Sequence, residues 1–245
     1  IFTAALDLSG HSTTAKLMRL SAEQQLEILG SVQLDPSVVQ YAHVAAGQVS
    51  ADGTIGVYLD GAVDASALIT ELVYWDKEQN LLHAPFSLED GEIRWRETEV
   101  YAGDINGDGV LEFPMPVYPP DAGVNQAQFF HWMNWDAQAN QSVLVSAVYI
   151  HPTDGYQLVL PSDWQDTVTV RDEESRRSVT FYEWVQGSSG STGALGASLL
   201  KIQVFSQVEW DTLPDQSTFH VLAQEEGSVY VCSLPNPSHP LAKTA

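Results

Sequence analysis

Short apolar segments, each bounded by Gly, Asp, Asn or Pro, recur along the whole chain and limit what it can fold into. Most of them alternate apolar and polar residues or form a brief continuous apolar stretch, which is typical of β-strands. Helix signals are few, so the sequence predicts a mainly β fold with a minor α component. The predicted strands are 56–59, 68–75, 93–101, 143–149, 156–160, 167–171, 178–184, 199–206, 219–223 and 228–233.

Two segments are compatible with a short helix. Ser21 and Gln24 have the spacing of a capping box ahead of Leu26 and Ile28. Leu26 and Ile28 also alternate as in a strand, so the sequence leaves both structures open at this point. Residues 125–132 are the second candidate helix.

Two other segments predict loops. Residues 114–120 contain four prolines, which cannot donate hydrogen bonds to a central strand. Residues 186–196 are rich in Gly and Ser, as in a flexible connection.

Four similar segments in the first 150 residues each place an aspartate between two apolar stretches. These aspartates are Asp7, Asp60, Asp104 and Asp136. We interpret each segment as a strand, an Asp-bearing turn and a second strand, as in the blades of β-propellers. Because the spacing is irregular and closed propellers mostly have more units, we expect a partial or degenerate propeller-like segment. Hairpins that resemble one another by chance are the alternative.

The aspartate pattern stops near residue 150, where Pro152 and the pair Asp154-Gly155 predict a turn. We therefore expect two domains, a propeller-like segment over 1–150 and a small antiparallel α+β module over 151–245. In the second domain Trp164 follows Pro161 at the end of an apolar strand, and we expect its ring to be buried.

Acidic residues outnumber basic ones by 32 to 10, which gives a formal net charge of −22. This charge argues against nucleic acid as a partner, because such binding depends on Lys and Arg at phosphates. No stretch approaches 18 consecutive apolar residues, so we expect no transmembrane segment. Cys232 is the only cysteine, which excludes an intrachain disulfide.

The segment 104–112 carries the most specific chemical pattern. Oxygen-bearing side chains stand at its positions one, three, five and nine, and position seven can supply a carbonyl, so five oxygens can converge on one hard cation. Gly109 at position six permits the sharp turn. Met115 replaces the bidentate Glu of a helix–loop–helix site, and the alternative is a hairpin turn without metal. We expect one Ca²⁺, with the ligands Asp104, Asn106, Asp108, the Val110 carbonyl and Glu112.

Residues 100–114 resemble the calcium loops of FG-GAP and VCBS-type β-propeller repeats. The resemblance implies Ca²⁺ at the ligands just named. Residues 7–11 are similar to a decayed copy of this loop, and we assign no metal to them. More loosely, the chain resembles exported lipoproteins of Gram-positive gut bacteria, in which a propeller-like segment precedes a small module. Residues 156–164 are similar to the opening of PsbP-like domains.

The chain begins at Ile1, without Met and without a charged-then-apolar leader. We expect a processed or truncated form that has lost a signal peptide or an upstream cysteine carrying a lipid anchor. With the family resemblance, this predicts an extracellular or cell-envelope-attached bacterial protein.

We expect a non-catalytic binding or structural protein, stabilised by Ca²⁺, whose unknown extracellular ligand is a protein or a carbohydrate. The alternative is a carbohydrate-active hydrolase that uses acidic residues such as Glu89 and Asp90 or Glu97 and Glu99. That chemistry needs two carboxyl groups about 5–9 Å apart across a bond. The aromatic segment 129–135 could stack on a sugar, but packing in a core is the reading that we favour. We assign no catalytic residue.

Overall fold

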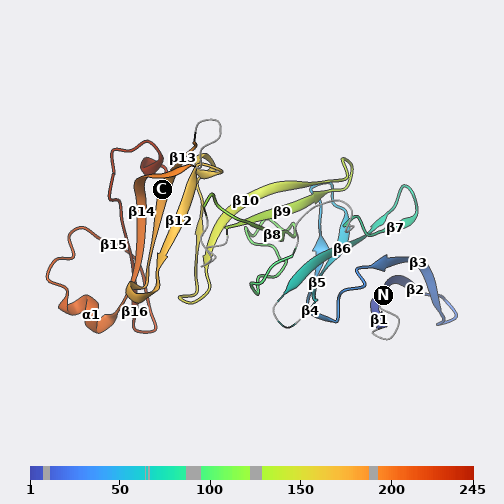
Figure 1. Cartoon of the computed structure of the whole chain (residues 1–245). Helices are drawn as coiled ribbons and strands as arrows, with labels where there is room; N and C mark the ends of the chain where they lie inside the picture. The colour runs from blue at the N-terminus through green and yellow to red at the C-terminus, as the bar shows by residue number, and fades with distance from the viewer. Residues whose placement is uncertain (8–11, 64, 66, 87–94, 122–128, 188–192) are drawn as a thin grey trace. The chain divides into compact units, whose positions relative to one another are not determined.

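The computed structural model describes residues 1–7, 12–63, 65, 67–86, 95–121, 129–187 and 193–245. It separates into two compact units (Figure 1). Unit 1 comprises Ile1–Pro116 and His131–Ser146, and unit 2 comprises Val117–Phe130 and Ala147–Ala245. The sequence-based division at residue 150 differs from this clustering in 117–130 and 147–150. One division point cannot describe these units, because each of them consists of two separate stretches of the chain.

Unit 1 contains two antiparallel meanders, sheets in which each strand pairs with the next one along the chain. The first sheet has the order β1-β2-β3 and the second has the order β4-β5-β6-β7. Their strands are β1 (Phe2–Asp7), β2 (Ser12–Leu20), β3 (Leu26–Leu34), β4 (Gln40–Gln48), β5 (Ile55–Ala62), β6 (Leu68–Asp76) and β7 (Leu81–His83).

Two clusters of buried side chains form the core of unit 1. One joins the two meanders through Ala15, Leu34, Leu59, Val73 and Leu82. The other surrounds Tyr58 and Leu72 and contains aromatic rings from later segments. Its buried members are Val49, Tyr58, Leu72, Tyr74, Ala102, Phe113 and Trp135.

A third sheet has the order β11-β10-β9-β8. Its strands are β8 (Phe113–Val117), β9 (Phe129–Asp136), β10 (Gln141–His151) and β11 (Tyr156–Val159). The segment 114–120 was predicted to be a loop, but residues 113–117 are a strand. This strand lies at the edge of its sheet, where a proline removes no hydrogen bond from the interior of the ladder.

Unit 2 contains a five-stranded antiparallel sheet with the order β12-β13-β14-β16-β15. The strands are β12 (Val168–Glu173), β13 (Ser178–Val185), β14 (Ala194–Ser206), β15 (His220–Glu225) and β16 (Ser228–Ser233). The single α-helix of the described residues, α1 (Gln207–Thr212), begins with a capping box in which Ser206 and Glu209 bond each other's backbone amides. Short 3₁₀ helices occupy Ser162–Trp164, Glu174–Arg176 and Leu241–Lys243.

Trp164 anchors the core of unit 2, as the sequence predicts. Its side chain is 1% exposed, and its ring centroid lies 5.5 Å from that of Phe181. The indole nitrogen donates a 2.9 Å hydrogen bond to the carbonyl of Leu241, near the end of the chain. The 3₁₀ helix at 162–164 is thereby fastened to the C-terminal segment.

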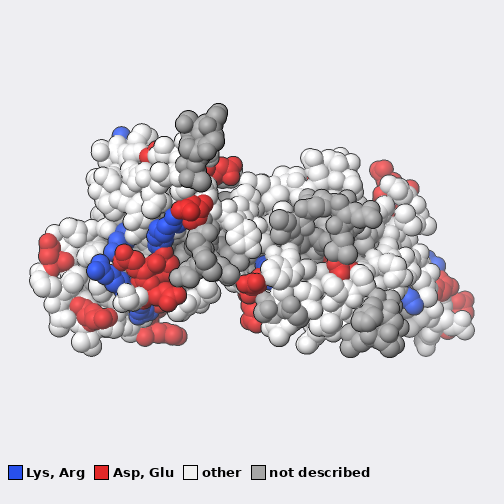
Figure 2. Space-filling model, in the orientation of Figure 1, with Lys and Arg blue, Asp and Glu red and all other residues white. Residues whose placement is uncertain are grey.

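The basic side chains of unit 2 are largely paired with acids. Arg171 bonds Asp121, and Nε of Arg177 lies 2.9 Å from Oδ1 of Asp154. Figure 2 shows basic side chains directly beside acidic ones in this part of the molecule. On the face drawn they form no basic patch. Among the described helices none has both the length and the apolar character to cross a membrane.

The mainly β fold with a minor α component is confirmed, and no sheet formed by the described residues closes into a barrel or propeller. Residues 26–34 are strand β3, which settles the choice left open there. Two further predictions were wrong. Of the predicted strand 93–101, the described residues 95–101 contain only an isolated bridge at Arg96, and residues 129–132 of the predicted helix belong to β9.

Candidate metal site

The segment 104–112 forms a closed loop whose two ends are tied together. Gly103 and Glu112 exchange two backbone hydrogen bonds of 2.9 Å, one in each direction. Next to this closure the amide of Leu111 donates to the carbonyl of Gln48 at the end of β4, at 2.7 Å. The loop is therefore held in place beside the β4–β7 sheet by these backbone hydrogen bonds.

The carboxylate of Asp104 organises the loop interior. Its Oδ1 accepts hydrogen bonds from the amides of Gly107 and Asp108, at 2.8 and 3.1 Å. Its Oδ2 accepts from the amide of Gly109 at 2.9 Å. Gly107 and Gly109 have φ values of 77° and 88°, a region that favours glycine, so these two positions allow the amides to turn inward.

Asn106 and Asp108 are bonded to each other on the exposed side of the loop. Nδ2 of Asn106 donates to Oδ2 of Asp108 at 2.9 Å, and Oδ1 of Asn106 accepts from the amide of Asp108 at the same distance. Oδ1 of Asp108 accepts from the amide of Val110 at 2.8 Å. The predicted ligands Asp104, Asn106 and Asp108 thus belong to one continuous hydrogen-bonded group.

Glu112 is the fully buried acid of the loop, with 0% of its side chain exposed. Its Oε2 accepts a 3.0 Å hydrogen bond from the amide of Ile105, whereas its Oε1 has no partner among the described residues. Burial and the nearby charges of Asp108 and Asp104 raise the pKa of this carboxyl group to about 7, although the bond from Ile105 opposes the shift. A buried oxygen without a partner is costly unless a proton or a cation meets it.

These residues have the donor chemistry of a calcium site, since carboxylate, amide and carbonyl oxygens are the ligands that Ca²⁺ prefers. The carboxylates of Asp104, Asp108 and Glu112 accept hydrogen bonds from backbone amides of the loop. No group of three or more His, Cys, Asp or Glu side chains in the described part of the chain is gathered closely enough to hold a metal ion. The loop therefore has the ligand types and one unsatisfied buried oxygen, but its side chains are not drawn together around one point.

A buried polar network that the sequence did not predict fixes the segment leading into the loop. Arg96 and Asp60 are both 0% exposed, and Nη2 of Arg96 lies 2.8 Å from Oδ1 of Asp60. Arg96 also donates to Thr70 at 2.9 Å and to the carbonyl of Val100 at 2.6 Å. The segment 95–103 is thereby bonded to β5 and β6, and the position of the loop depends on it.

Asp60 was predicted to occupy a turn, but it lies inside β5. Oδ2 of Asp60 lies 3.1 Å from Nδ1 of His43, whose ring centroid lies 5.2 Å from that of Tyr101. Asp136, by contrast, ends β9 and accepts the amides of Gln138 and Ala139, as expected for a turn. The decayed loop copy at 7–11 lies largely outside the described residues.

The hydrolase alternative named two pairs of carboxylates. Glu97 and Glu99 are exposed, and the pair Glu89 and Asp90 lies outside the described residues. The buried acid Glu71 accepts the amide of Asp35 through Oε1 at 2.6 Å and the hydroxyl of Tyr41 through Oε2 at 3.0 Å. These contacts hold Glu71 in the interior of the protein.

The aromatic segment 129–135 packs in the interior. Phe129, Phe130, Trp132 and Trp135 are each at most 7% exposed, which leaves no ring face of these four for a sugar. The packing interpretation of the segment is confirmed.

In comparisons with protein-family models, curated proteins and solved structures, nothing matches the chain.

Proposed function

We propose that this protein is a non-catalytic, calcium-stabilised binding protein of the bacterial cell envelope. Its calcium ion would be held by Asp104, Asn106, Asp108, Glu112 and the carbonyl of Val110. The ion would fix the loop ahead of β8 and neutralise acids that otherwise repel one another. Export and envelope attachment rest on the resemblance of residues 100–114 and 156–164 to parts of exported proteins.

The observation that carries this proposal is the buried Oε1 of Glu112. An anionic carboxylate in this position has one oxygen without a partner in the described part of the chain. It also has two neighbours of like charge, Asp104 and Asp108. A divalent cation would satisfy the oxygen and offset the three negative charges. A solvent-exposed hairpin turn has no need for a buried acid at its ninth position.

The propeller-like character of residues 1–150 is part of the same proposal. The sheets β4–β7 and β8–β11 are both four-stranded meanders, which is the form of a propeller blade. In this interpretation the sheets are diverged blades that need not surround a common axis. In the sequence the calcium loop lies between these two sheets, directly ahead of β8. A bound ion would there restrain the segment that connects β7 to β8.

Calorimetric titration of the chelator-treated full chain with CaCl₂ tests the proposal. We expect one ion per chain with a Kd on the order of 10⁻⁴–10⁻³ M, as in extracellular modules, because no bidentate Glu stands at position twelve. Glu112→Gln should remove the binding heat, because an amide supplies a weaker, neutral ligand. The absence of heat for the unaltered protein at millimolar calcium would reduce segment 104–112 to a hairpin turn.

A further inference from the structure

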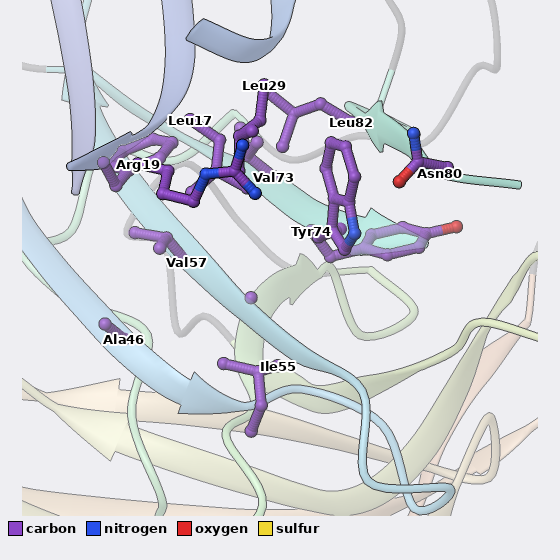
Figure 3. A pocket seen from close by; sticks show the side chains of 13 residues that line it. Leu17, Arg19, Leu29, Ala46, Ile55, Val57, Val73, Tyr74, Asn80 and Leu82 are labelled. Carbon is purple, nitrogen blue, oxygen red and sulfur yellow. The ribbon is translucent and has the colours of Figure 1, made fainter. Parts of the chain in front are cut away.

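Unit 1 contains a pocket of about 500 Å³ that is lined by residues of both meanders (Figure 3). Its walls are mostly apolar and include Leu17, Val57, Trp75 and Leu82. Arg19 is the one charged side chain among the described residues that line it. A pocket of this size, with apolar walls and few polar groups, is typical of a site for a small molecule.

The pocket lies where the core of unit 1 opens along β2. Thr13, Ala15, Leu17 and Arg19 share one face of this strand, since alternate residues point the same way. Thr13 and Ala15 are at most 1% exposed, Leu17 is half-buried and Arg19 is exposed. The two sheets are therefore tightly packed at one end of β2 and leave room at the other.

A β-bulge on β3 shapes one wall. Leu17 pairs with Gly30 and Met18 pairs with Ile28, so Leu29 is an extra residue with no partner in the ladder. A bulge changes the direction in which a side chain points. Leu29 lines the pocket, and the next residue, Gly30, is half-buried. Its side chain is 39% exposed, which leaves an apolar surface open to a ligand.

Gly30 brings β3 close to the other sheet. A Cβ atom at this position would lie 2.8 Å from Cβ of Leu82 and 3.2 Å from the ring of Trp75. The backbone of β3 therefore approaches these two side chains more closely than any other residue would allow. This contact closes the pocket beside the ring of Trp75.

Arg19 supplies a charge that a ligand can use. Figure 3 shows its guanidinium directed into the pocket, toward Leu17 and Leu29. Its Nη2 bonds Oε2 of Glu27 at 2.7 Å, but the side chains of Arg19 and Glu27 are 64% and 47% exposed. Exposed pairs are weak, and a guanidinium has five N–H donors, so a second anion can share or displace this contact.

A neighbouring polar pocket sets the direction in which a ligand would lie. It shares Ile55, Tyr74 and Trp75 with the apolar pocket. Its charged lining is three acids, Asp52, Asp76 and Glu78, and one base, Lys77, so the net charge of this lining is negative. These carboxylates repel an anionic group, whereas Arg19 attracts one. An amphipathic anion would place its head at Arg19 and its apolar part over Val57 and Trp75.

We infer that this pocket binds an amphipathic carboxylate, a molecule with an apolar chain or ring and one anionic head. The inference names the class of ligand that the proposed binding function leaves open, and it rests on that function. Calcium at the loop 104–112 does not enter the pocket chemistry.

Isothermal titration of the full chain with octanoate and decanoate, below their micelle concentrations, tests the apolar part. Each buried CH₂ group should tighten binding about fourfold, so decanoate should bind about 15-fold more tightly than octanoate. 1-Decanol should bind more weakly than decanoate, and decyltrimethylammonium more weakly still. Tighter binding of the cation than of decanoate would overturn the inference, because the acidic pocket would then determine the ligand.

Two charge variants test the head group. Arg19→Met should weaken decanoate binding about tenfold and leave 1-decanol unchanged, because it removes a charge-assisted hydrogen bond. Glu27→Gln should tighten decanoate binding, because it removes the competing carboxylate. Lys16→Met, on the opposite face of β2, is the charge-matched control. Equal decanoate affinities of the unaltered protein and Arg19→Met would contradict the assignment.

A pair of alanine variants tests the place of binding. Ala46 is exposed and lines the pocket, and Ala42 is an exposed residue at a bulge of β4 that does not line it. Ala46→Phe should fill the space and abolish decanoate binding, whereas Ala42→Phe should leave it intact. Unchanged melting temperatures would show that both variants are folded. Decanoate binding that survives Ala46→Phe would place the ligand elsewhere.

The titrations are repeated with calcium and with chelator. If the unaltered protein binds no decanoate either with calcium or with chelator, the pocket assignment is refuted. The calcium loop is then still open to its own test. Decanoate binding without any calcium heat would refute the metal site and leave the pocket standing.

Discussion

The amide nitrogen of Ala102 donates a 2.9 Å hydrogen bond to Oδ2 of Asp60, a residue 42 positions earlier in the chain. Ala102 lies two positions before the first predicted calcium ligand. The other oxygen of the same carboxylate binds Arg96 and Thr70, at 2.8 and 2.6 Å. A single buried acid thus connects the interior of the β4–β7 sheet to the start of the loop.

Asp60→Asn should destabilise the protein by about 3–5 kcal/mol, because it removes the buried negative charge that lies beside the guanidinium of Arg96. Urea denaturation of the calcium-free chain measures this free energy of unfolding. Asp52→Asn changes an exposed acid and should stay within about 0.5 kcal/mol of the unaltered protein. A similarly small effect at Asp60 would mean that the ion pair with Arg96 does not hold the loop.

Asp108→Ala should abolish the stabilisation by calcium and leave unit 2 folded. Calcium at 100 times its Kd should stabilise the unaltered protein by about 2.7 kcal/mol, because it binds only the folded state. Thermal unfolding with and without calcium measures this increment. Asp136→Ala is the control, since this aspartate also accepts two backbone amides but lies in another turn. Calcium stabilisation that persists in Asp108→Ala would remove Asp108 from the ligand set.

The calcium-free protein should become less stable as the pH rises from about 4.5 to about 7. The pKa of Glu112 is 4.5 in an ordinary environment and about 7 in the folded state, chiefly because the group is buried. The folded chain therefore holds a proton that the unfolded chain releases, and its contribution to stability is lost as the pH passes through the folded pKa. The difference corresponds to about 3 kcal/mol.

Glu112→Gln isolates this contribution, because glutamine is a neutral residue of similar shape. Above pH 7 and without calcium, this variant should unfold at a higher urea concentration than the unaltered protein. Glu97→Gln, at an exposed carboxylate, should not. If Glu112→Gln destabilises the protein at pH 8, the carboxylate is satisfied there by a partner other than a proton or a cation.

Trp164→Ala should cost about 3–5 kcal/mol of stability, as expected when a large buried ring is deleted. The variant also leaves the carbonyl of Leu241 without its indole donor. Trp95→Ala, at a side chain that is 41% exposed, is the matched control and should have a small effect. Equal melting temperatures of the two variants would contradict an anchoring role for Trp164.

The sequence predicted strands that form a short apolar or alternating stretch bounded by turn residues. Strands β5, β6 and β10 to β16 correspond to predicted segments within a few residues. Of the first four strands, β1 and β2 were expected only as the arms of the segment around Asp7 and β4 was missed. For β3 the sequence left helix and strand open, and its burial shows the reason. Most of β3 is exposed, with apolar residues such as Leu26 and Ile28 on its surface, so its pattern contains little of the alternation that burial imposes.

The two parts of the candidate site differ in the same way. The loop 104–112 is contiguous, so the oxygen-bearing types and the glycines can be recognised from spacing alone. Asp60 and Arg96 lie 36 positions apart, and nothing local marks either as buried. Only the tertiary structure shows that an arginine preceded by an exposed tryptophan is completely enclosed.

The two prolines of β8 have a consequence for self-association. Pro114 and Pro116 are alternate residues of an edge strand, so their backbone nitrogens face the same side, and neither carries a hydrogen. Both prolines are buried, and at these two alternate positions β8 has no amide donor for a neighbouring strand. Prolines in an edge strand are one of the devices that limit edge-to-edge aggregation of β-sheet proteins, and the edge strand β8 contains two of them.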